Sequence, residues 1–357
     1  MKNRQTLKHI AEKSGMSLSS VSRSLDPARS HLVRPATREK ILKCAKDINF
    51  TVNLSARRLR RNQTEVITVV VYQNSFKPKM SSTEFISPST GHDNIQKLSM
   101  AIKSRNYDMK LEFLPEGQRL PDTIFDRNRT DGIIFVNYYG TAYIDILEKT
   151  RLPNIYMSNF IDTTRTDVAL VGLDREPGYR QALEHQINSD GKSFAWVTPP
   201  AQFASDINTK VINKLFREYG IYNEAIFFDN VRSYYDIQRL IDDFEKNPFD
   251  TTFCRNDVIA DWVVRELRSR GIRVPEDVAV IGYDNDPAYH GEGTINVATI
   301  DAPAGLMMKI AGEKLFKMID ENEVSKRLPQ VTLETVFISG DTERKIPTKN
   351  LNLKMET

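Results

Sequence analysis

The sequence lacks the short motifs that mark many enzymes built from alternating strands and helices. It contains no phosphate-binding GxxxxGK[ST] loop, no GxGxxG turn, no GxSxG elbow and no HExxH zinc motif. Its five histidines are scattered, and Asp284, Asn285 and Asp286 have no further carboxylates at a fixed spacing to complete a cation site. We therefore expect no enzymatic activity, no cofactor and no resident metal.

Cysteines and long apolar runs are also scarce. Cys44 and Cys254 lie far apart without the rhythm of metal ligands, so two buried free thiols in a reducing compartment are expected. No apolar run is long enough to cross a bilayer, and the opening MKNRQTLKHI has no apolar signal core. These absences favour a cytoplasmic protein that does not use a membrane.

The charge is small in total but unevenly distributed. The chain of 357 residues has a net charge of +3, which is made up of +11 in residues 1–62 and −8 in the remainder. A length of this size predicts two or three domains. A small basic head on an acidic body is typical of a protein that binds a polyanion, and nucleic acid is favoured over a membrane surface.

Residues 6–26, TLKHIAEKSGMSLSSVSRSLD, predict two short helices joined by a tight turn. Thr6 and Ser17 are in N-cap positions, where a hydroxyl accepts from a first-turn amide, and Gly15 permits the bend. Val21 and Leu25 of the second helix point inward, while its other face carries serines and an arginine. Such a helix can lie in a DNA major groove, although a helical hairpin with a solvated face is the alternative. Residues 37–48 predict a third helix.

Residues 53–61, NLSARRLRR, carry four arginines and little apolar surface. The segment is an interdomain linker whose arginines repel one another. Beside phosphates that repulsion becomes attraction, so the segment could fold on binding DNA. Leu59 is an apolar side chain among arginines, and it could wedge between base pairs in a minor groove.

From residue 65 onward, β-branched runs alternate with amphipathic helical stretches, which predicts an α/β body with parallel sheets. About ten strands are too many for one small sheet, so two lobes are expected. Residues 74–94, rich in Ser, Pro and Thr, predict a long loop before the next helix, and QVTLETVFI (330–338) predicts the last strand.

Four separate stretches resemble the lactose/galactose repressor (LacI/GalR) family of bacterial transcriptional regulators. The second helix reads SLSSVSRSL, the third carries TREK, and the linker carries Asn53, Ala56, Arg57 and Leu59 in the family's N-x-x-AR-x-L pattern. FCRNDVIADWVVRELRSRGIRVPEDVAVIGYDN follows the family pattern closely. The resemblance implies an all-α helix-turn-helix head and an α/β two-lobed body like a type I periplasmic binding protein.

The resemblance also divides the chain. It implies a DNA-binding head at 1–50, a hinge helix or linker at 51–62, an effector-binding and dimerisation body at 63–345 and a tail at 346–357. Crossing of the chain between the lobes implies one lobe at 63–161 and 294–321, and the other at 162–293 and 322–345.

The function that the resemblance implies is sequence-specific regulation of transcription, as a repressor of carbohydrate-utilisation genes. A homodimer would bind pseudo-palindromic double-stranded operator DNA, and a small sugar-like effector between the lobes would change its affinity. The tail lacks a leucine heptad, which favours a dimer over a tetramer. The alternative is a regulator that answers to a protein partner or has a vestigial effector cleft, because the 74–94 loop departs from the family pattern.

Two sets of candidate contacts follow. Arg23 is the best candidate for a bidentate contact to guanine, and Leu18 could meet a thymine methyl. The implied DNA contacts are Thr6, Ser17, Leu18, Ser19, Ser20, Arg23, His31, Arg34, Asn53, Ser55, Ala56, Arg57 and Leu59. Arg34 replaces the family's usual serine in a longer loop, so we expect that phosphate contact to differ from the family's.

The expected effector contacts lie where strands end, because ligands of open α/β sheets bind at the carboxyl ends of the strands. The family's effector-clamping arginine has no clear counterpart in this sequence, and Asp206 and Asn208 stand nearby instead. That substitution predicts a neutral polyol rather than a carboxylate-bearing effector. The expected set is Tyr72, Asn137, Ser158, Asp206, Asn208, Asn256 and Asp284.

Overall fold

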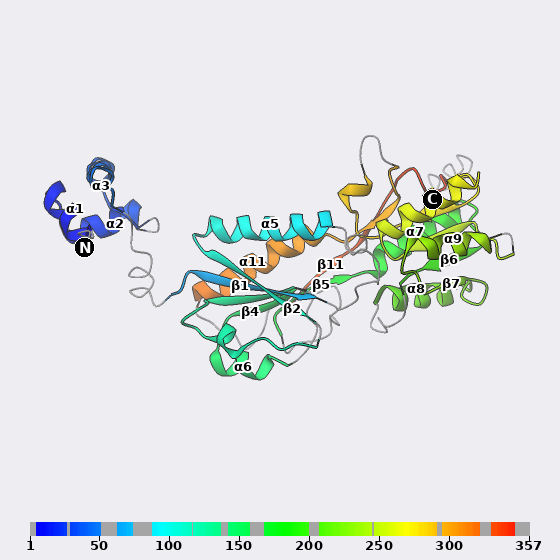
Figure 1. The fold of residues 1–357 in the computed structure, drawn as a ribbon, viewed down its shortest axis with the longest axis horizontal. Coiled ribbons are helices and arrows are strands. Elements are labelled where there is room, and N and C mark those ends of the chain that lie inside the picture. Colours follow the sequence, from blue (N-terminus) through cyan, green and yellow to red (C-terminus); the bar gives the residue numbers. More distant parts are fainter. Residues whose placement is uncertain are drawn as a thin grey trace, which may run out of the picture. The chain divides into compact units, whose positions relative to one another are not determined.

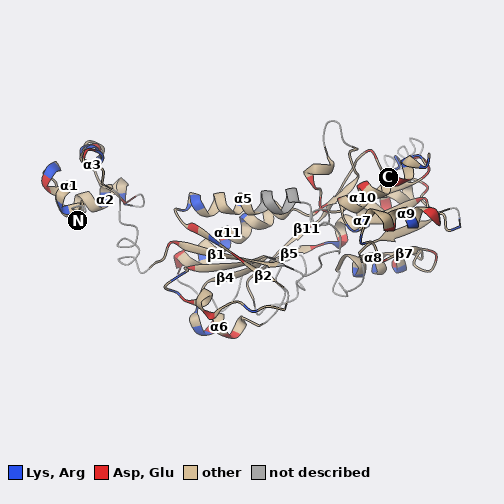
Figure 2. Ribbon diagram, in the orientation of Figure 1, with Lys and Arg blue, Asp and Glu red and all other residues tan. Residues whose placement is uncertain are grey.

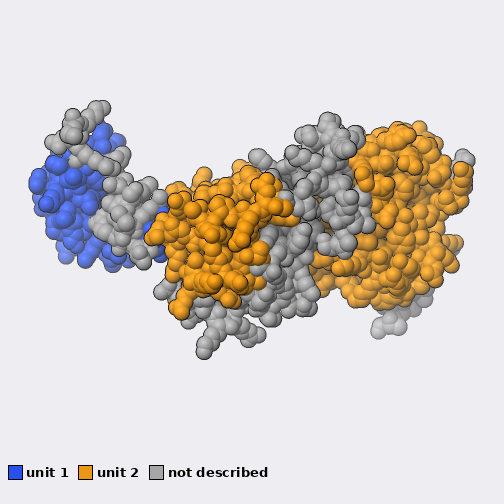
Figure 3. Space-filling model, turned by 60° about the horizontal axis from the view of Figure 1, so that its bottom comes forward, with its two compact units in different colours: residues 1–64 blue, residues 65–357 orange. Residues whose placement is uncertain are grey.

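The computed structural model describes most of the chain as two compact units, residues 1–64 and residues 65–357 (Figure 3). Each unit is treated by itself. The described residues are 5–26, 29–50, 63–73, 88–115, 117–136, 142–157, 168–199, 207–244, 246–290, 295–321 and 330–346, with side chains described from 95 onward in the helix that begins at 88.

The first unit contains the three predicted helices. Ile10, Val21 and Ile41 have no exposed surface and form its core, with Ala45 beside them. Gly15 ends the first helix with φ of 67°, in the left-handed region that favours glycine. The helices are α1 (Leu7–Ser14), α2 (Leu18–Ser24) and α3 (Pro35–Asp47), with a 3-10 turn, η1 (Ser30–Leu32), before the last.

The second unit contains a six-stranded sheet whose strands all run parallel. Every residue of its central strand GIIFV is buried, as expected of a strand covered on both faces. In the order in which they pair, the strands are β11 (Gln330–Glu334), β5 (Leu170–Asp174), β4 (Asn154–Met157), β3 (Gly132–Val136), β1 (Val66–Gln73) and β2 (Asp108–Pro115).

Helices cover both faces of this sheet. The helices α5 (Pro88–Ser104) and α11 (Ala304–Glu321) pack against each other on one face, and α6 (Ile144–Thr150) lies on the other (Figure 1). Leu315 of α11 lies against Gly132, where an added Cβ would stand 3.1 Å from its Cδ1. A short 3-10 helix, η2 (Asp122–Phe125), precedes β3.

A second parallel sheet of four strands lies later in the chain. Its strands pair in the order β7 (Ile226–Phe228), β6 (Phe194–Val197), β8 (Thr251–Cys254) and β9 (Ala279–Ile281). Its helices are α7 (Glu176–Asn188), α8 (Ile207–Glu218), α9 (Tyr234–Asp242) and α10 (Asp257–Ser269), and a 3-10 turn, η4 (Pro287–Tyr289), follows β9. A separate antiparallel pair joins β10 (Thr299–Asp301) to β12 (Val336–Ile338).

The alternating α/β body and its two parallel sheets are confirmed, but three details differ from the prediction. The strand β5 pairs with β4 and β11 pairs with β5, so both strands complete the six-stranded sheet instead of belonging to the later lobe. The single strand expected at 330–338 is divided into β11 and β12, which belong to different sheets. Thr335 between them is buried, and its hydroxyl oxygen accepts from the Gly178 amide of α7 at 3.2 Å. The helix α5 begins at Pro88, inside the predicted loop, of which residues 74–87 lie outside the described residues.

Candidate DNA-reading helix and effector site

The second helix of the head separates the predicted contacts into two groups. Ser17 caps the helix, because its Oγ accepts from the Ser20 amide at 3.1 Å and lies 2.9 Å from the Ser20 hydroxyl. Leu18, Ser19 and Arg23 are exposed, with 46% of Leu18 accessible. An exposed leucine next to a serine and an arginine is the chemistry needed to read base edges. Ser17 and Ser20 are instead engaged in holding the helix start.

The start of the first helix uses a residue that the sequence analysis did not select. The Thr6 backbone amide donates to His9 Nδ1 at 3.1 Å, and the Thr6 hydroxyl lies 2.9 Å from the same ring nitrogen. A His side chain thus reaches back to the N-cap residue, as Glu or Gln does in a capping box. The spacing of three residues between Thr6 and His9, which is that of a capping box, is the signal in the sequence that indicates this contact.

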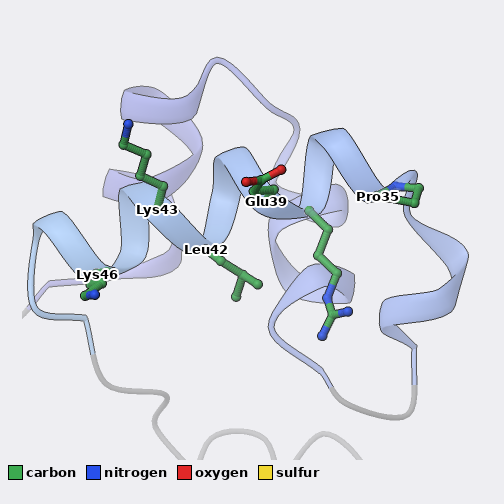
Figure 4. A pocket seen from close by; sticks show the side chains of 6 residues that line it. Pro35, Glu39, Leu42, Lys43 and Lys46 are labelled. Atoms are coloured by element: carbon green, nitrogen blue, oxygen red, sulfur yellow. The ribbon is translucent and has the colours of Figure 1, made fainter.

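The surface of the third helix is basic around an exposed apolar residue. His31 and Arg34, both predicted to contact DNA, are exposed just before this helix. Leu42 is 41% exposed, and Figure 2 shows Lys and Arg along α1 and α3. A shallow hollow on α3 is lined by Pro35, Arg38, Glu39, Leu42, Lys43 and Lys46 (Figure 4).

Several predicted contacts lie outside the described residues. In the hinge these are Asn53, Ser55, Ala56, Arg57 and Leu59. In the body they are Asn137, Ser158 and Asp206. All of them stay predictions.

Two predicted effector residues meet at the carboxyl edge of the four-stranded sheet. Asn256 follows β8 and Asp284 follows β9, and these two strands pair in parallel. The two loops are joined by a hydrogen bond from the Asp257 amide to the Tyr283 carbonyl at 3.0 Å. Asn256 caps α10, where its Oδ1 accepts from the Ile259 amide at 3.0 Å. Asn256 therefore acts as a helix cap through its oxygen, and its side-chain NH2 group is the part that can donate to a ligand.

Asp284 has a positive φ and a carboxyl pKa above its ordinary value. Its φ is 104° and that of Asn285 is 51°, and such strain in residues other than glycine concentrates at functional sites. Burial raises the pKa of Asp284 to about 7, although the guanidinium groups of Arg255 and Arg175 oppose the shift. No hydrogen bond or ion pair to its carboxylate is seen within the part of the chain that the structure describes.

A buried carboxylate behind this edge holds the loop in place. Asp257 accepts from the Thr299 hydroxyl at 2.6 Å and from the Asp286 amide at 2.8 Å, and His290 Nε2 lies 3.5 Å away. A Cβ on residue 282 would lie 2.1 Å from Asp257 Oδ1, so Gly282 is required for this approach. Sequence reasoning missed this group, because Thr299 lies 42 residues from Asp257.

Burial raises the pKa of Asp257, against the effect of its hydrogen bonds from His290, Thr299 and Asp286. Burial alone would lower the pKa of His290, but hydrogen bonds to Asp257 and Asn296 outweigh it, so that this pKa is raised. The hydrogen bond between His290 and Asp257 therefore acts against the effect of burial on both groups. Its role is to position the loop that carries Asp284.

The two remaining predicted contacts are less accessible. Asn208, in the first turn of α8, is 2% exposed. Tyr72 is half-buried near the carboxyl end of β1. Both stay predictions.

The described residues offer neither a cluster of metal ligands nor a membrane-spanning helix. No three His, Cys, Asp or Glu side chains in the described ranges are grouped so as to hold a metal ion. Of the helices that could be inspected, none combines the length and apolar composition needed to cross a bilayer.

Known proteins resemble this chain in both its helical head and its α/β body. The periplasmic binding protein-like domain family matches residues 174–342. The chain is 26% identical over 353 residues to the probable HTH-type transcriptional repressor ExuR of Bacillus subtilis (strain 168), covering 96% of this chain and 99% of that protein. The chain is thus similar along nearly its whole length to a transcriptional repressor, and its later part matches a periplasmic binding protein-like domain.

Solved structures of transcriptional regulators share the fold of this chain. The lac repressor dimer bound to operator and the anti-inducer ONPF matches with a TM-score of 0.70 at 18% identity, covering 95% of this chain and 99% of that one. The transcriptional regulator CelR in complex with cellobiose matches with a TM-score of 0.62 at 21% identity, covering 95% and 100%. The predicted fold class, a helical head with a two-lobed body, is confirmed.

Proposed function

We propose that this chain is a sequence-specific DNA-binding regulator of transcription, a repressor of carbohydrate-utilisation genes that responds to a sugar-like effector. It acts as a cytoplasmic homodimer on pseudo-palindromic operator DNA and catalyses no reaction. The observation that carries the proposal is the exposed face of α2, where Leu18, Ser19 and Arg23 project from a helix whose inward side is fixed by Val21. The similarity to a repressor along nearly the whole chain supports it.

The effector site follows from the second unit. Ligands of open α/β sheets bind at the carboxyl ends of strands. Asn256 and Asp284 lie at that edge, and carboxylate and amide groups recognise sugar hydroxyls in fixed directions. Related proteins are named for sugar operons, and one is solved with cellobiose. Effector binding changes operator affinity by a coupling free energy that is typically ~1–3 kcal/mol.

Direct binding to DNA tests the proposal. The full chain is titrated onto labelled duplexes from the region upstream of its own gene, with unrelated duplexes as competitors. Arg23→Ala should remove the preference for one region and leave nonspecific binding nearly unchanged, because a bidentate arginine contact contributes about 1–3 kcal/mol of base discrimination. Arg29→Ala, at a loop residue that is 62% exposed, is the matched control. Equal loss of preference in both variants would contradict the role of Arg23.

A further inference from the structure

His290 lies between two hydrogen-bond acceptors. Its Nδ1 lies 3.1 Å from the Asn296 side-chain oxygen, and its Nε2 lies 3.5 Å from Oδ2 of Asp257. An amide oxygen can only accept, so Nδ1 carries the hydrogen of the first contact. A neutral imidazole has a single N–H, and its Nε2 then presents a lone pair to the carboxylate. Both contacts are hydrogen bonds only if one further proton lies on Nε2 or on Asp257.

The carboxylate side of this pair is enclosed. Asp257 is 1% exposed, and its two oxygens accept from the Thr299 hydroxyl at 2.6 Å and from the Asp286 amide at 2.8 Å. The Thr299 hydroxyl in turn accepts from the Asn285 amide at 3.3 Å. Loss of the further proton would leave a buried negative charge facing an imidazole lone pair, which is costly away from water. The surroundings therefore favour retention of that proton.

The pKa values and the neighbouring charges support the same conclusion. Burial lowers the pKa of His290, but its hydrogen bonds to Asp257 and Asn296 outweigh this, and burial raises the pKa of Asp257. Residues 295–299 carry no titratable side chain. Among the described residues, the other titratable groups around the pair are Asp284 and Asp286 in the loop, Tyr289 on η4 and Cys254 at the end of β8, with Asp261 and Arg265 of α10 acting on Tyr289. Apart from Arg265, which pairs with Asp261 at 2.8 Å, these groups can become only negative, which favours retention of the proton.

We propose that His290 and Asp257 share one proton, and that this proton fastens the loop of residues 284–290 to the segment of residues 295–299. The loop is held by the Asp286 amide on Asp257 and by His290 on Asn296. When the proton leaves at alkaline pH, one of the two His290 contacts is lost and the loop loosens. His290 is thus a positioning residue for the loop that carries Asp284. The inference goes beyond the proposed function, because it holds whichever ligand binds beside the loop.

Urea unfolding of the full chain between pH 7 and pH 9 tests the shared proton. This window lies above the pKa of Asp284, about 7, and below the ordinary thiol value of 9.0, which burial raises further for Cys254. An unfolded histidine, with an ordinary pKa of 6.5, has lost its proton here, whereas the folded pair retains it. The stability that the proton provides is therefore lost as pH rises through the pKa of the pair. The unfolding equilibrium constant should rise with pH, by at most about 10-fold per pH unit for one proton.

Two variants and a control separate the shared proton from ordinary packing. His290→Gln places an amide donor near the position of Nε2 but cannot titrate, so the rise should disappear. Asn296→Ala removes one acceptor, and a neutral imidazole can then place its single hydrogen on Nε2, toward Asp257. The rise should shrink in this variant, although both members of the pair are intact. His31→Gln, at an exposed position in the other unit, should unfold with the pH profile of the wild type.

Hydrogen–deuterium exchange measures whether the proton holds the loop. After correction for the intrinsic rate at each pH, the amides of residues 284–290 should exchange several-fold faster at pH 9 than at pH 7 in the wild type. In His290→Gln the corrected rates should be equal at the two pH values. Residues 132–136 of β3, in the other parallel sheet, are the internal reference and should keep their protection.

Each adverse result overturns a different step. Equal pH profiles of unfolding for the wild type and His290→Gln would overturn the shared proton. A rise that Asn296→Ala leaves unchanged would overturn the requirement for two acceptors. Loop exchange that does not respond to pH in the wild type would overturn the fastening of the loop, and this result and that of Asn296→Ala decide the matter even if His290→Gln folds poorly. None of these measurements involves DNA or a sugar, so the proposed function is tested separately.

Discussion

Replacing Asp284 with Asn should stabilise the body at neutral and alkaline pH. The folded pKa of this carboxyl is about 7, against an ordinary value of 3.8. Between these values the folded protein keeps a proton that the unfolded chain has lost, so the free energy of unfolding of the wild type decreases as pH rises from about 4 to about 7. Asn carries no such charge, and it also tolerates the φ of 104° better than most residues.

The expected gain can be bounded. Each pH unit between the two pKa values is worth about 1.4 kcal/mol, which sets a ceiling of about 4 kcal/mol. Because Asp284 keeps partial access to water, we expect about 1–2 kcal/mol at pH 8 and a much smaller difference at pH 4. The same change should weaken effector binding, since an amide replaces the carboxylate that accepts from ligand hydroxyls.

Urea unfolding followed by tryptophan fluorescence provides the assay. Both tryptophans, Trp196 and Trp262, lie in elements of the four-stranded sheet region. Asp277→Asn is the control of opposite sign, because the Arg273 guanidinium lowers the pKa of Asp277 to about 2, so its ionised form favours the folded state above pH 4. An Asp284→Asn advantage that does not change between pH 4 and pH 8, or a variant less stable than wild type at pH 8, would refute the reasoning.

Three further predictions concern the head, the glycine behind Asp284 and the salt dependence. Ile41→Ala should destabilise the head by about 2–5 kcal/mol and abolish DNA binding, while thermal shift of the body by its effector persists. Gly282→Ala should lower the free energy of unfolding by about 1–3 kcal/mol and weaken effector binding, because the added Cβ displaces Asp257. Gly312→Ala in α11 is the control and should be tolerated, because its added Cβ meets only Leu98, at 3.8 Å. The logarithm of DNA affinity should fall steeply with the logarithm of salt, with a slope near −0.9 per phosphate neutralised, and a flat response in anisotropy titrations would contradict the electrostatic argument.

Local patterns predicted most of the fold. The spacing of apolar residues in the head indicated its three helices. A helix that buries one face must place apolar residues such as Ile10, Val21 or Ile41 at the helical period. The β-branched runs indicated the buried parallel strands for the same kind of reason. The placement of β5 and β11 failed, because it depends on which sheet a strand joins. That choice is set by pairing between distant segments, such as Gln330 with Leu170, and no local pattern records it.

The site was predictable only where a polar residue lies within a few positions of the end of a strand. Asn256 and Asp284 were found in this way, and the structure brings their loops together. The buried carboxylate of Asp257 was missed because its partners Thr299 and His290 lie 42 and 33 residues further along the chain.

The central claim is that the exposed face of α2 reads a specific DNA sequence in a pair of heads. The most direct measurement is selection of bound duplexes from a random pool by the full chain, followed by sequencing, with Arg23→Ala selected in parallel. We expect the wild type to enrich one pseudo-palindromic motif and Arg23→Ala to lose that enrichment. Enrichment of no motif by the wild type, or of the same motif by both proteins, would contradict the account.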